Sequence, residues 1–156
     1  MTKAPPKPLI RRTVAADVVG IVALLADDDL GRGREDASVQ ALARYLAAFE
    51  VLARDPNQIP IVLEHDGRIA GYLQLTLIPG LSRQGMWRGL IESVRIDKAL
   101  RGQKFGEAMM LWAIDECRNR GCGLVQLTTD KSRDDAHRFY SRLGFKATHE
   151  GMKLAL

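Results

Sequence analysis

The sequence has few of the residues that build disulfide scaffolds, and it has no long apolar run. Only two cysteines, Cys117 and Cys122, occur in 156 residues, which is too few for a disulfide framework. The longest apolar run, residues 18–26, is far short of the ~20 residues of a membrane span. The first residues lack the apolar segment of a secretory signal. We therefore expect a cytoplasmic protein with reduced cysteines that does not cross a membrane.

Metal-binding and nucleic-acid-binding signatures are also absent from the sequence. His65, His137 and His149 do not have the spacing of metal ligands, so no metal is expected. The formal charge is only +4, its basic residues are scattered, and no zinc-finger, RRM or helix-turn-helix pattern is present. Attraction to an anionic cofactor explains this charge as well as nucleic acid would. We expect no nucleic-acid partner.

What the sequence does contain is the composition of one ordinary globular domain. It is 46% hydrophobic and 27% charged, which is typical of a folded chain with a single core. The lysine- and proline-rich start predicts a mobile tail over residues 1–8. We expect a single domain over residues 9–156.

Hydrophobic periodicity and turn residues predict a mixed α/β chain. His65-Asp66-Gly67 between two apolar runs is a hairpin signal. The expected elements are, in order, strand 9–12, helices 15–26 and 38–54, strands 59–64, 68–77 and 89–96, helix 105–120, strand 124–129, helix 132–143, and strands 145–147 and 152–156.

A basic, glycine-containing stretch separates the strand at 89–96 from the helix at 105–120: Arg101-Gly102-Gln103-Lys104-Phe105-Gly106. Unpaired N–H groups and the positive dipole end at a helix start favour anions such as a diphosphate. The stretch is neither G-x-G-x-x-G nor G-x-x-x-x-G-K-[ST], so nicotinamide dinucleotides and P-loop nucleotides are not favoured. A phosphorylated ligand of another kind is expected. An ordinary basic helix start without a ligand is the alternative.

A second motif follows at residues 136–145, with the sequence A-H-R-F-Y-S-R-L-G-F. In order and distance, the two motifs resemble the R/Q-x-x-G-x-G/A turn and the A-x-x-F-Y-x-x-L-G-F helix of the GNAT superfamily of N-acetyltransferases. The resemblance implies the GNAT fold, a central mixed β-sheet flanked by about four helices. The sequence departs from the family at Lys104, where glycine is usual, and at Arg133, where many relatives have asparagine.

The resemblance implies acetyl-coenzyme A as the cosubstrate. The backbone of Val94, Arg95 and Ile96 would pair with the pantetheine arm like an added strand. The stretch from Arg101 to Gly106 would hold the diphosphate, and Arg133 would reach a phosphate. Lys104 either adds a charge to this turn or weakens it, because its side chain stands where glycine lets the backbone approach.

Two residues are candidates for proton transfer. The resemblance makes Tyr140 the general acid for the departing thiolate; the alternative is a helix aromatic that packs beside Phe139 and Phe145. Strand alternation predicts that Glu92 lies in one apolar row with Leu90, Val94 and Ile96. Burial there would raise its pKa and suit a general base. A structural carboxylate tied to N–H groups or to an arginine is equally compatible with this position.

The predicted function is transfer of acetyl to a primary amine of a small molecule by direct attack in a ternary complex. The resemblance implies that residues 27–36, 79–87 and 149–151 frame the acceptor, and the acids of the first loop would favour a cationic amine. Acetylation of a protein N-terminus or lysine is one alternative. A noncatalytic acyl-coenzyme A binding module is another. GNAT-like proteins often dimerise, so a homodimer is compatible with the resemblance.

Overall fold

Five strands form one sheet, in the order in which they occur along the chain. The structure is a computed structural model that describes residues 8–29 and 31–156. The strands are β1 (Leu9–Arg12), β2 (Gln58–His65), β3 (Arg68–Ile78), β4 (Arg88–Ile96) and β5 (Leu124–Leu127). Neighbours are antiparallel from β1 to β4, whereas β4 and β5 are parallel. A parallel pair requires a crossover connection, which a helix provides here.

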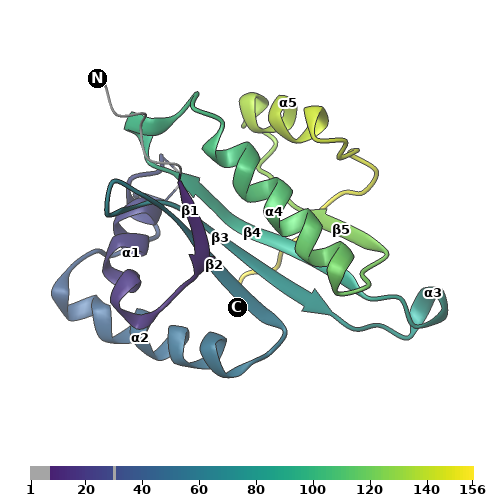
Figure 1. Ribbon diagram of the computed structural model, residues 1–156, viewed down its shortest axis with the longest axis horizontal. Coiled ribbons are helices and arrows are strands. Elements are labelled where there is room, and N and C mark those ends of the chain that lie inside the picture. The colour runs from purple at the N-terminus through teal and green to yellow at the C-terminus, as the bar shows by residue number, and fades with distance from the viewer. Residues whose placement is uncertain (1–7, 30) are drawn as a thin grey trace, which may run out of the picture.

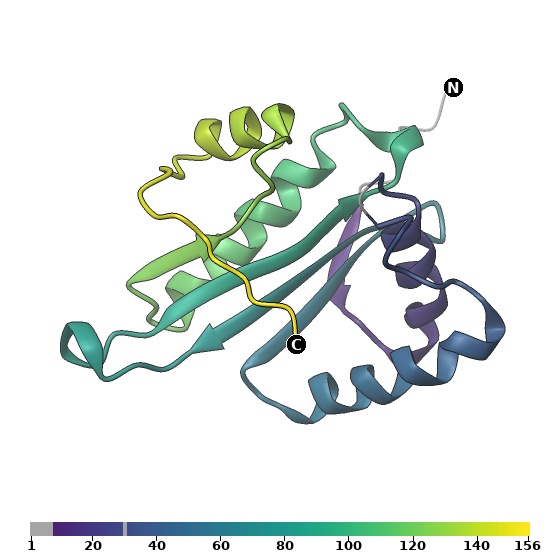
Figure 2. The same cartoon turned by 180° about the vertical axis from the view of Figure 1, so that it is seen from behind.

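Helices cover both faces of this sheet (Figures 1 and 2). They are α1 (Val18–Ala26), α2 (Val39–Arg54), α3 (Ser82–Gly85), α4 (Phe105–Asn119) and α5 (Asp134–Arg142). α1 and α2 lie on one face, while α4 and α5 lie on the other. We call these the α1 face and the α4 face. Ser38 begins α2 as expected, because its hydroxyl accepts the N–H of Ala41 at 3.3 Å.

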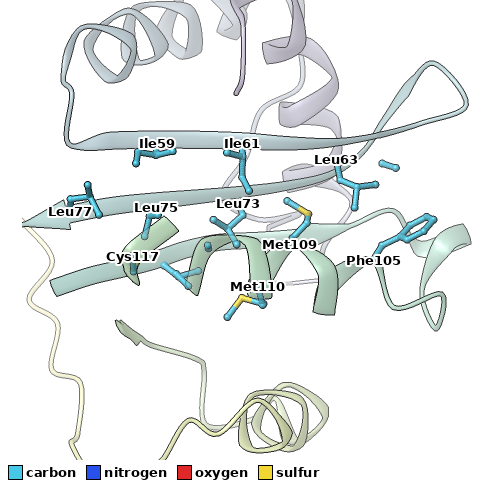
Figure 3. Packing of buried hydrophobic residues seen from close by; sticks show 13 residues of the cluster. Ile59, Ile61, Leu63, Leu73, Leu75, Leu77, Phe105, Met109, Met110 and Cys117 are labelled. Atoms are coloured by element: carbon cyan, nitrogen blue, oxygen red, sulfur yellow. The ribbon is translucent and has the colours of Figure 1, made fainter. Parts of the chain in front are cut away.

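The main core lies between the sheet and α4 (Figure 3). Alternate residues of β2 and β3 point toward this helix, where Met109 and Met110 are fully buried. Burial of each such side chain contributes about 1.5–3 kcal/mol. A smaller cluster on the α1 face joins Ile21 of α1 to Val62 and Tyr72 of the sheet. Both faces of β2 are therefore apolar, and both helix layers are fixed to the sheet.

Most of the expected elements form within two residues of their expected ends. The hairpin between β2 and β3 is confirmed, with φ of 51° at Asp66 and 71° at Gly67. Two positive φ values are what a two-residue type I′ turn requires. All four expected helices are present. The tail expected at residues 1–8 lies outside the described residues, apart from Pro8.

The two strands expected at 145–147 and 152–156 are wrong. The N–H of Phe145 donates to the carbonyl of Tyr140 at 3.1 Å, and Gly144 has a φ of 92°. This segment therefore closes the end of α5 instead of pairing with β5. Residues 146–156 are exposed and form no strand. They run across the sheet on the α1 face (Figure 2).

A short turn was also missed. α3 has only four residues, and Arg83 and Gln84 have left-handed φ values of 53° and 60°. It is a tight turn in the β3–β4 connection and not a regular helix. Among the helices of the described residues, none has the length and apolar character that a membrane crossing requires.

Candidate active site

The parallel strands β4 and β5 separate after a short pairing. They pair only from Arg88 with Leu124 to Ile91 with Leu127, where β5 ends. No strand of the described residues continues along that side of β4 from residue 92 to 96. Backbone N–H and C=O groups at such an edge can pair with an extended ligand. We call this opening between β4 and β5 the split.

A bulge at Ser93 accompanies the opening. Tyr72 of β3 pairs with Arg95 of β4, and Gln74 pairs with Glu92. One residue of β3 lies between Tyr72 and Gln74, whereas two residues of β4 lie between Glu92 and Arg95, so β4 contains one extra residue. Ser93 has a φ of 54°, which is unusual for a residue other than glycine. A bulge of this kind increases the local twist and shifts the alternation of side chains by one position.

The expected burial of Glu92 is wrong because of this shift. Val94 and Ile96 pack against the core on the α4 face. Glu92 lies opposite Gln74 in the β3–β4 register. The side chain of Gln74 accepts a hydrogen bond from Tyr72, which belongs to the cluster on the α1 face. Directly paired residues point to the same face of a sheet, so Glu92 lies on the α1 face, where it is exposed. Its charge, together with burial of the phenol, raises the pKa of Tyr72 to about 12.

The turn from Arg101 to Gly106 starts α4 as expected. No side chain caps the helix, so its first N–H groups are free for an anion. Gly102 has a φ of 82°, and Lys104 has a φ of 63°. Lys104 therefore has a left-handed backbone conformation. A glycine would adopt this conformation without strain, which explains the usual residue at this position.

An open cleft of about 260 Å³ lies beside this turn. Its basic lining residues are Lys98, Arg101 and Arg133, and its other lining residues are Asp28, Asp29 and Ser132. A Cβ atom built on Gly106 lies 3.6 Å from both Ile96 and Phe139. The start of α4, the end of β4 and helix α5 therefore meet here. The structure places the expected phosphate-binding residues around one end of the split.

Tyr140 projects from α5 and is half-buried. Its ring lies 5.2 Å from Phe139 and 6.1 Å from Phe145, both with edge-to-face geometry. Burial raises the pKa of the Tyr140 hydroxyl, and the positive charges of Arg133 and Arg95 act in the opposite direction. The hydroxyl is thus protonated at neutral pH and lies near two guanidinium groups. These properties suit a proton donor whose anion is stabilised by nearby charge.

Asp28 joins the two sides of the split, a role that no sequence pattern indicates. It is 5% exposed and follows α1. Its Oδ1 lies 3.2 Å from Nη2 of Arg133, at the start of α5, and its Oδ2 lies 3.4 Å from Nη2 of Arg95 on β4. Arg95 also donates to the carbonyl of Val94 at 2.8 Å. Residues 105 positions apart in sequence are in contact here, and no local pattern reports that.

The other acids of the loop after α1 are also paired within the protein. Most of these pairs are exposed at the surface, and the hypothesis that the loop attracts a cationic amine stays a prediction. The pairs are Asp27 with Lys98, Asp29 with Arg32, Glu35 with Tyr45, and Asp36 with Arg44.

The loops expected to frame the acceptor lie at opposite ends of β4. Trp87 accepts the N–H of Gly123 at 2.9 Å where β4 begins, whereas Asp27 contacts Lys98 just beyond its end. The nine residues of β4 span roughly 26 Å at a strand's rise per residue. Loops 27–36 and 79–87 cannot both contact one small acceptor, so the expectation that they frame it together is wrong.

A polar network on the α1 face was also missed. Gln58 Oε1 accepts from Thr76 at 2.9 Å and from Gln74 at 3.2 Å, and the Tyr72 hydroxyl donates to Gln74 at 3.4 Å. Glu92 pairs with Gln74 in register. Polar residues at alternate positions of an otherwise apolar β3 are the sequence signal that could have identified this partly open part of the sheet.

Histidines and cysteines do not form a site in the part of the chain that the structure describes. No group of three or more histidine, cysteine or acidic residues there could hold a metal ion. Cys117 is buried and Cys122 is half-buried, both as free thiols. Burial raises the pKa of Cys117 to about 12, so it is a poor nucleophile at neutral pH.

The model of the acetyltransferase (GNAT) family matches residues 22–145. The chain belongs to this family, and its mixed α/β structure has the GNAT fold.

Three relatives illustrate the similarity. The chain is 36% identical over 95 residues to the aminoalkylphosphonate N-acetyltransferase of Salmonella typhimurium, covering 61% of each protein. It is 36% identical over 90 residues to the glucosamine 6-phosphate N-acetyltransferase of Trypanosoma brucei brucei, covering 58% of this chain and 59% of that protein. These matches span about three fifths of the curated relatives. The crystal structure of a transcriptional regulator from Bacillus halodurans C-125 is 45% identical, with a TM-score of 0.93 over 96% of this chain and 100% of that one.

Proposed function

We propose that this protein transfers an acetyl group from acetyl-coenzyme A to a primary amine of a small molecule. The observation that carries the proposal is the split, which offers an unpaired strand edge beside an anion-binding helix start. Membership of the acetyltransferase family and similarity to two N-acetyltransferases of small amines support it. Acetylation of a protein N-terminus or lysine is the alternative, and it would require an open peptide groove beside the split.

The residues of the split fit the parts of acetyl-coenzyme A. The edge at Val94, Arg95 and Ile96 suits the two amides of the pantetheine arm, because amides pair with a strand edge. The turn from Arg101 to Gly106 suits the diphosphate, with Lys98 and Arg133 as further cations. When bound there, acetyl-coenzyme A supplies a thioester near Tyr140.

The proposed reaction is direct attack of the amine on the thioester carbonyl. The N–C bond forms, the C–S bond breaks, and the thiolate leaves. Glu92 takes a proton from the ammonium form of the acceptor, directly or through water, because it is an exposed carboxylate on the face that the polar network leaves open. Tyr140 gives its proton to the thiolate, and the charges of Arg133 and Arg95 stabilise the resulting phenolate. The attacking nitrogen loses its second proton as the amide forms, and this proton restores Tyr140 from phenolate to phenol. One proton is released overall, from Glu92 to solvent.

Titration calorimetry with acetyl-coenzyme A tests the cofactor site. In Gly106→Glu, a carboxylate extends toward Ile96 and Phe139, which lie 3.6 Å from the position of the new Cβ. It would obstruct the split and repel the diphosphate. Gly106→Ala is the matched control, because a Cβ atom at 3.6 Å makes an ordinary van der Waals contact. We expect binding to the wild type and Gly106→Ala, and none to Gly106→Glu.

A binding wild type then justifies a rate assay with a panel of primary amines. Absence of binding by the wild type would refute the proposed activity. Equal binding by all three proteins would place the cofactor elsewhere than the split.

A further inference from the structure

Three arginines and one carboxylate form a cluster on the α1 side of the split. Asp28 contacts Arg95 at 3.4 Å and Arg133 at 3.2 Å. Burial is the main cause that lowers the pKa of Arg95, and the charge of Asp28 raises it. The positive charges of Arg133 and Arg34 lower the same pKa further, so Arg34 is close enough to act on Arg95. The Arg34 side chain is exposed and makes no ion pair among the described residues. Three guanidinium charges against one carboxylate leave two positive charges unbalanced.

The cluster also has unused hydrogen-bonding capacity in its interior. Nε of Arg95 and Oδ2 of Asp28 are buried atoms without a hydrogen-bond partner in the described structure. The Arg95 side chain is only 14% exposed. An unpaired buried donor destabilises the folded state, so such a group is best explained by a ligand that completes it. The missing partner of Arg95 Nε must be an acceptor, because a guanidinium N–H can only donate.

The cluster is distinct from the cleft assigned to the cofactor diphosphate. Asp28 and Arg133 line both, but neither Arg34 nor Arg95 lines that cleft. Arg95 pairs with Tyr72 and points to the α1 face, where Glu92 also lies. Their partners on β3 are two residues apart, so the two side chains start from the same face of the sheet roughly 7 Å apart. One small molecule can reach both.

We infer that Arg34, Arg95 and Arg133 bind an anionic group of the acceptor, and that the acceptor is a small primary amine carrying a phosphate or phosphonate. This inference rests on the proposed function, whose acceptor it specifies. The amine of such a molecule lies near Glu92 while its anionic group contacts the arginines. A doubly charged phosphorus group balances the two excess positive charges, which a neutral or cationic amine cannot do.

A matched pair of acceptors tests the inference. Ethanolamine and 2-aminoethyl phosphate share the reacting amine and differ by the phosphate. We expect kcat/KM for the phosphorylated amine to exceed that for ethanolamine by about 100-fold or more. In Arg95→Gln and Arg34→Gln, kcat/KM for 2-aminoethyl phosphate should fall by about 10- to 100-fold through KM. In Arg34→Gln, rates with ethanolamine and KM for acetyl-coenzyme A should stay unchanged.

Two variants keep the test independent of folding. Arg95 is largely buried, but Arg34 is exposed, so Arg34→Gln should fold normally. Arg44→Gln is the control, because Arg44 is an exposed arginine on α2 that contacts only Asp36. It should leave the preference for the phosphorylated amine unchanged.

Several outcomes would overturn the inference without affecting the proposed activity. A preference for ethanolamine would do so. Equal losses for both amines in Arg34→Gln would do so as well. An increase in KM for acetyl-coenzyme A alone would assign these arginines to the cofactor.

A binding measurement without turnover separates the two proposals. Inorganic phosphate titrated into the protein saturated with coenzyme A should bind, and should bind more weakly to Arg34→Gln than to Arg44→Gln. Equal binding to both variants, or no binding to the wild type, would reject the anion site. Absence of acetyl-coenzyme A binding would instead reject the proposed activity.

Discussion

At the scale of single residues, Lys104 has the clearest conflict between its side chain and its backbone. Its φ of 63° is left-handed, a conformation that costs a residue other than glycine about 1–2 kcal/mol. We expect Lys104→Gly to raise the free energy of unfolding by about 1 kcal/mol, because relief of this strain exceeds the added entropy of the unfolded chain. Urea unfolding followed by circular dichroism measures the change.

The neighbouring residue provides the control for this substitution. Gln103 lies in the same exposed turn but has no positive φ. Gln103→Gly should therefore lower the stability slightly, because it adds only unfolded-state entropy. Similar gains in both variants would show that the left-handed backbone of Lys104 carries no strain.

Tyr140 is the residue whose chemistry is most easily separated from its packing. Tyr140→Phe keeps the ring contacts with Phe139 and Phe145 and removes only the hydroxyl. We expect kcat to fall by about 10²- to 10⁴-fold, the usual contribution of a general acid, while the affinity for acetyl-coenzyme A stays the same. Steady-state rates and calorimetry measure the two quantities.

A second tyrosine controls for the loss of any hydroxyl. Tyr45→Phe removes a hydroxyl on α2 that donates to Glu35, and it should leave kcat unchanged. An unaltered kcat in Tyr140→Phe would mean that the thiolate is protonated by another group or by water.

At the scale of elements, Arg11 of β1 ties together the start of α1 and strand β2. It donates to both oxygens of Asp17, at 2.8 and 3.0 Å, and to Glu64 at 3.0 Å. The hydrogen bonds from Arg11 lower the pKa of Asp17, against the effect of burial. We expect Asp17→Asn to cost about 2 kcal/mol at pH 7, since hydrogen bonds to charged groups contribute about 1.5–3 kcal/mol.

The same substitution has a definite pH dependence. The folded pKa of Asp17 lies below its unfolded value of about 3.9, so its contribution is complete at neutral pH and is lost as the pH falls below about 4. The stability difference between wild type and Asp17→Asn should shrink in that range. Asp115→Asn, in an exposed pair with Arg118, should show no such difference. A gap that stays constant down to pH 3 would contradict the assigned role of Asp17.

Elements that depend on local signals were predictable from the sequence. The Asp66-Gly67 turn and the Ser38 cap each act within a few residues, and both occur as expected. The bulge at Ser93 was not predictable, because its φ of 54° occurs at a residue with no preference for it. That one inserted residue places Glu92 on the opposite face from Val94 and Ile96, so the expected burial of this candidate base was wrong.

Contacts between distant segments limited the prediction of the site in the same way. The motifs at residues 101–106 and 136–145 were readable because each is continuous in sequence. Asp28, Arg34 and Arg95 come together only because the segment after α1 folds over the end of β4. Their spacing in the chain has no periodicity that a sequence pattern could report.

At the scale of the whole molecule, the split divides the sheet into two unequal parts. β1 to β4 form a continuous antiparallel unit, whereas β5 is held by four pairs and by its packing with α4. The end of β4, the start of α4 and helix α5 meet around Gly106. A ligand bound along the split would join these three elements, so its binding should stabilise amides in regions that are distant in sequence.

Hydrogen exchange with and without acetyl-coenzyme A tests this coupling. At a ligand concentration of 100 times Kd, binding stabilises the native state by about 2.7 kcal/mol. Amides within residues 94–96 and 102–107 should gain more protection than this global effect provides, because the ligand covers them directly. Amides of residues 61–63, in the centre of β2, should gain no more than the global effect. Protection confined to β1 and β2, or uniform across the sheet, would show that the ligand does not occupy the split. Only a ligand that lies between β4 and α5 shields residues 94–96 and residues 102–107 together.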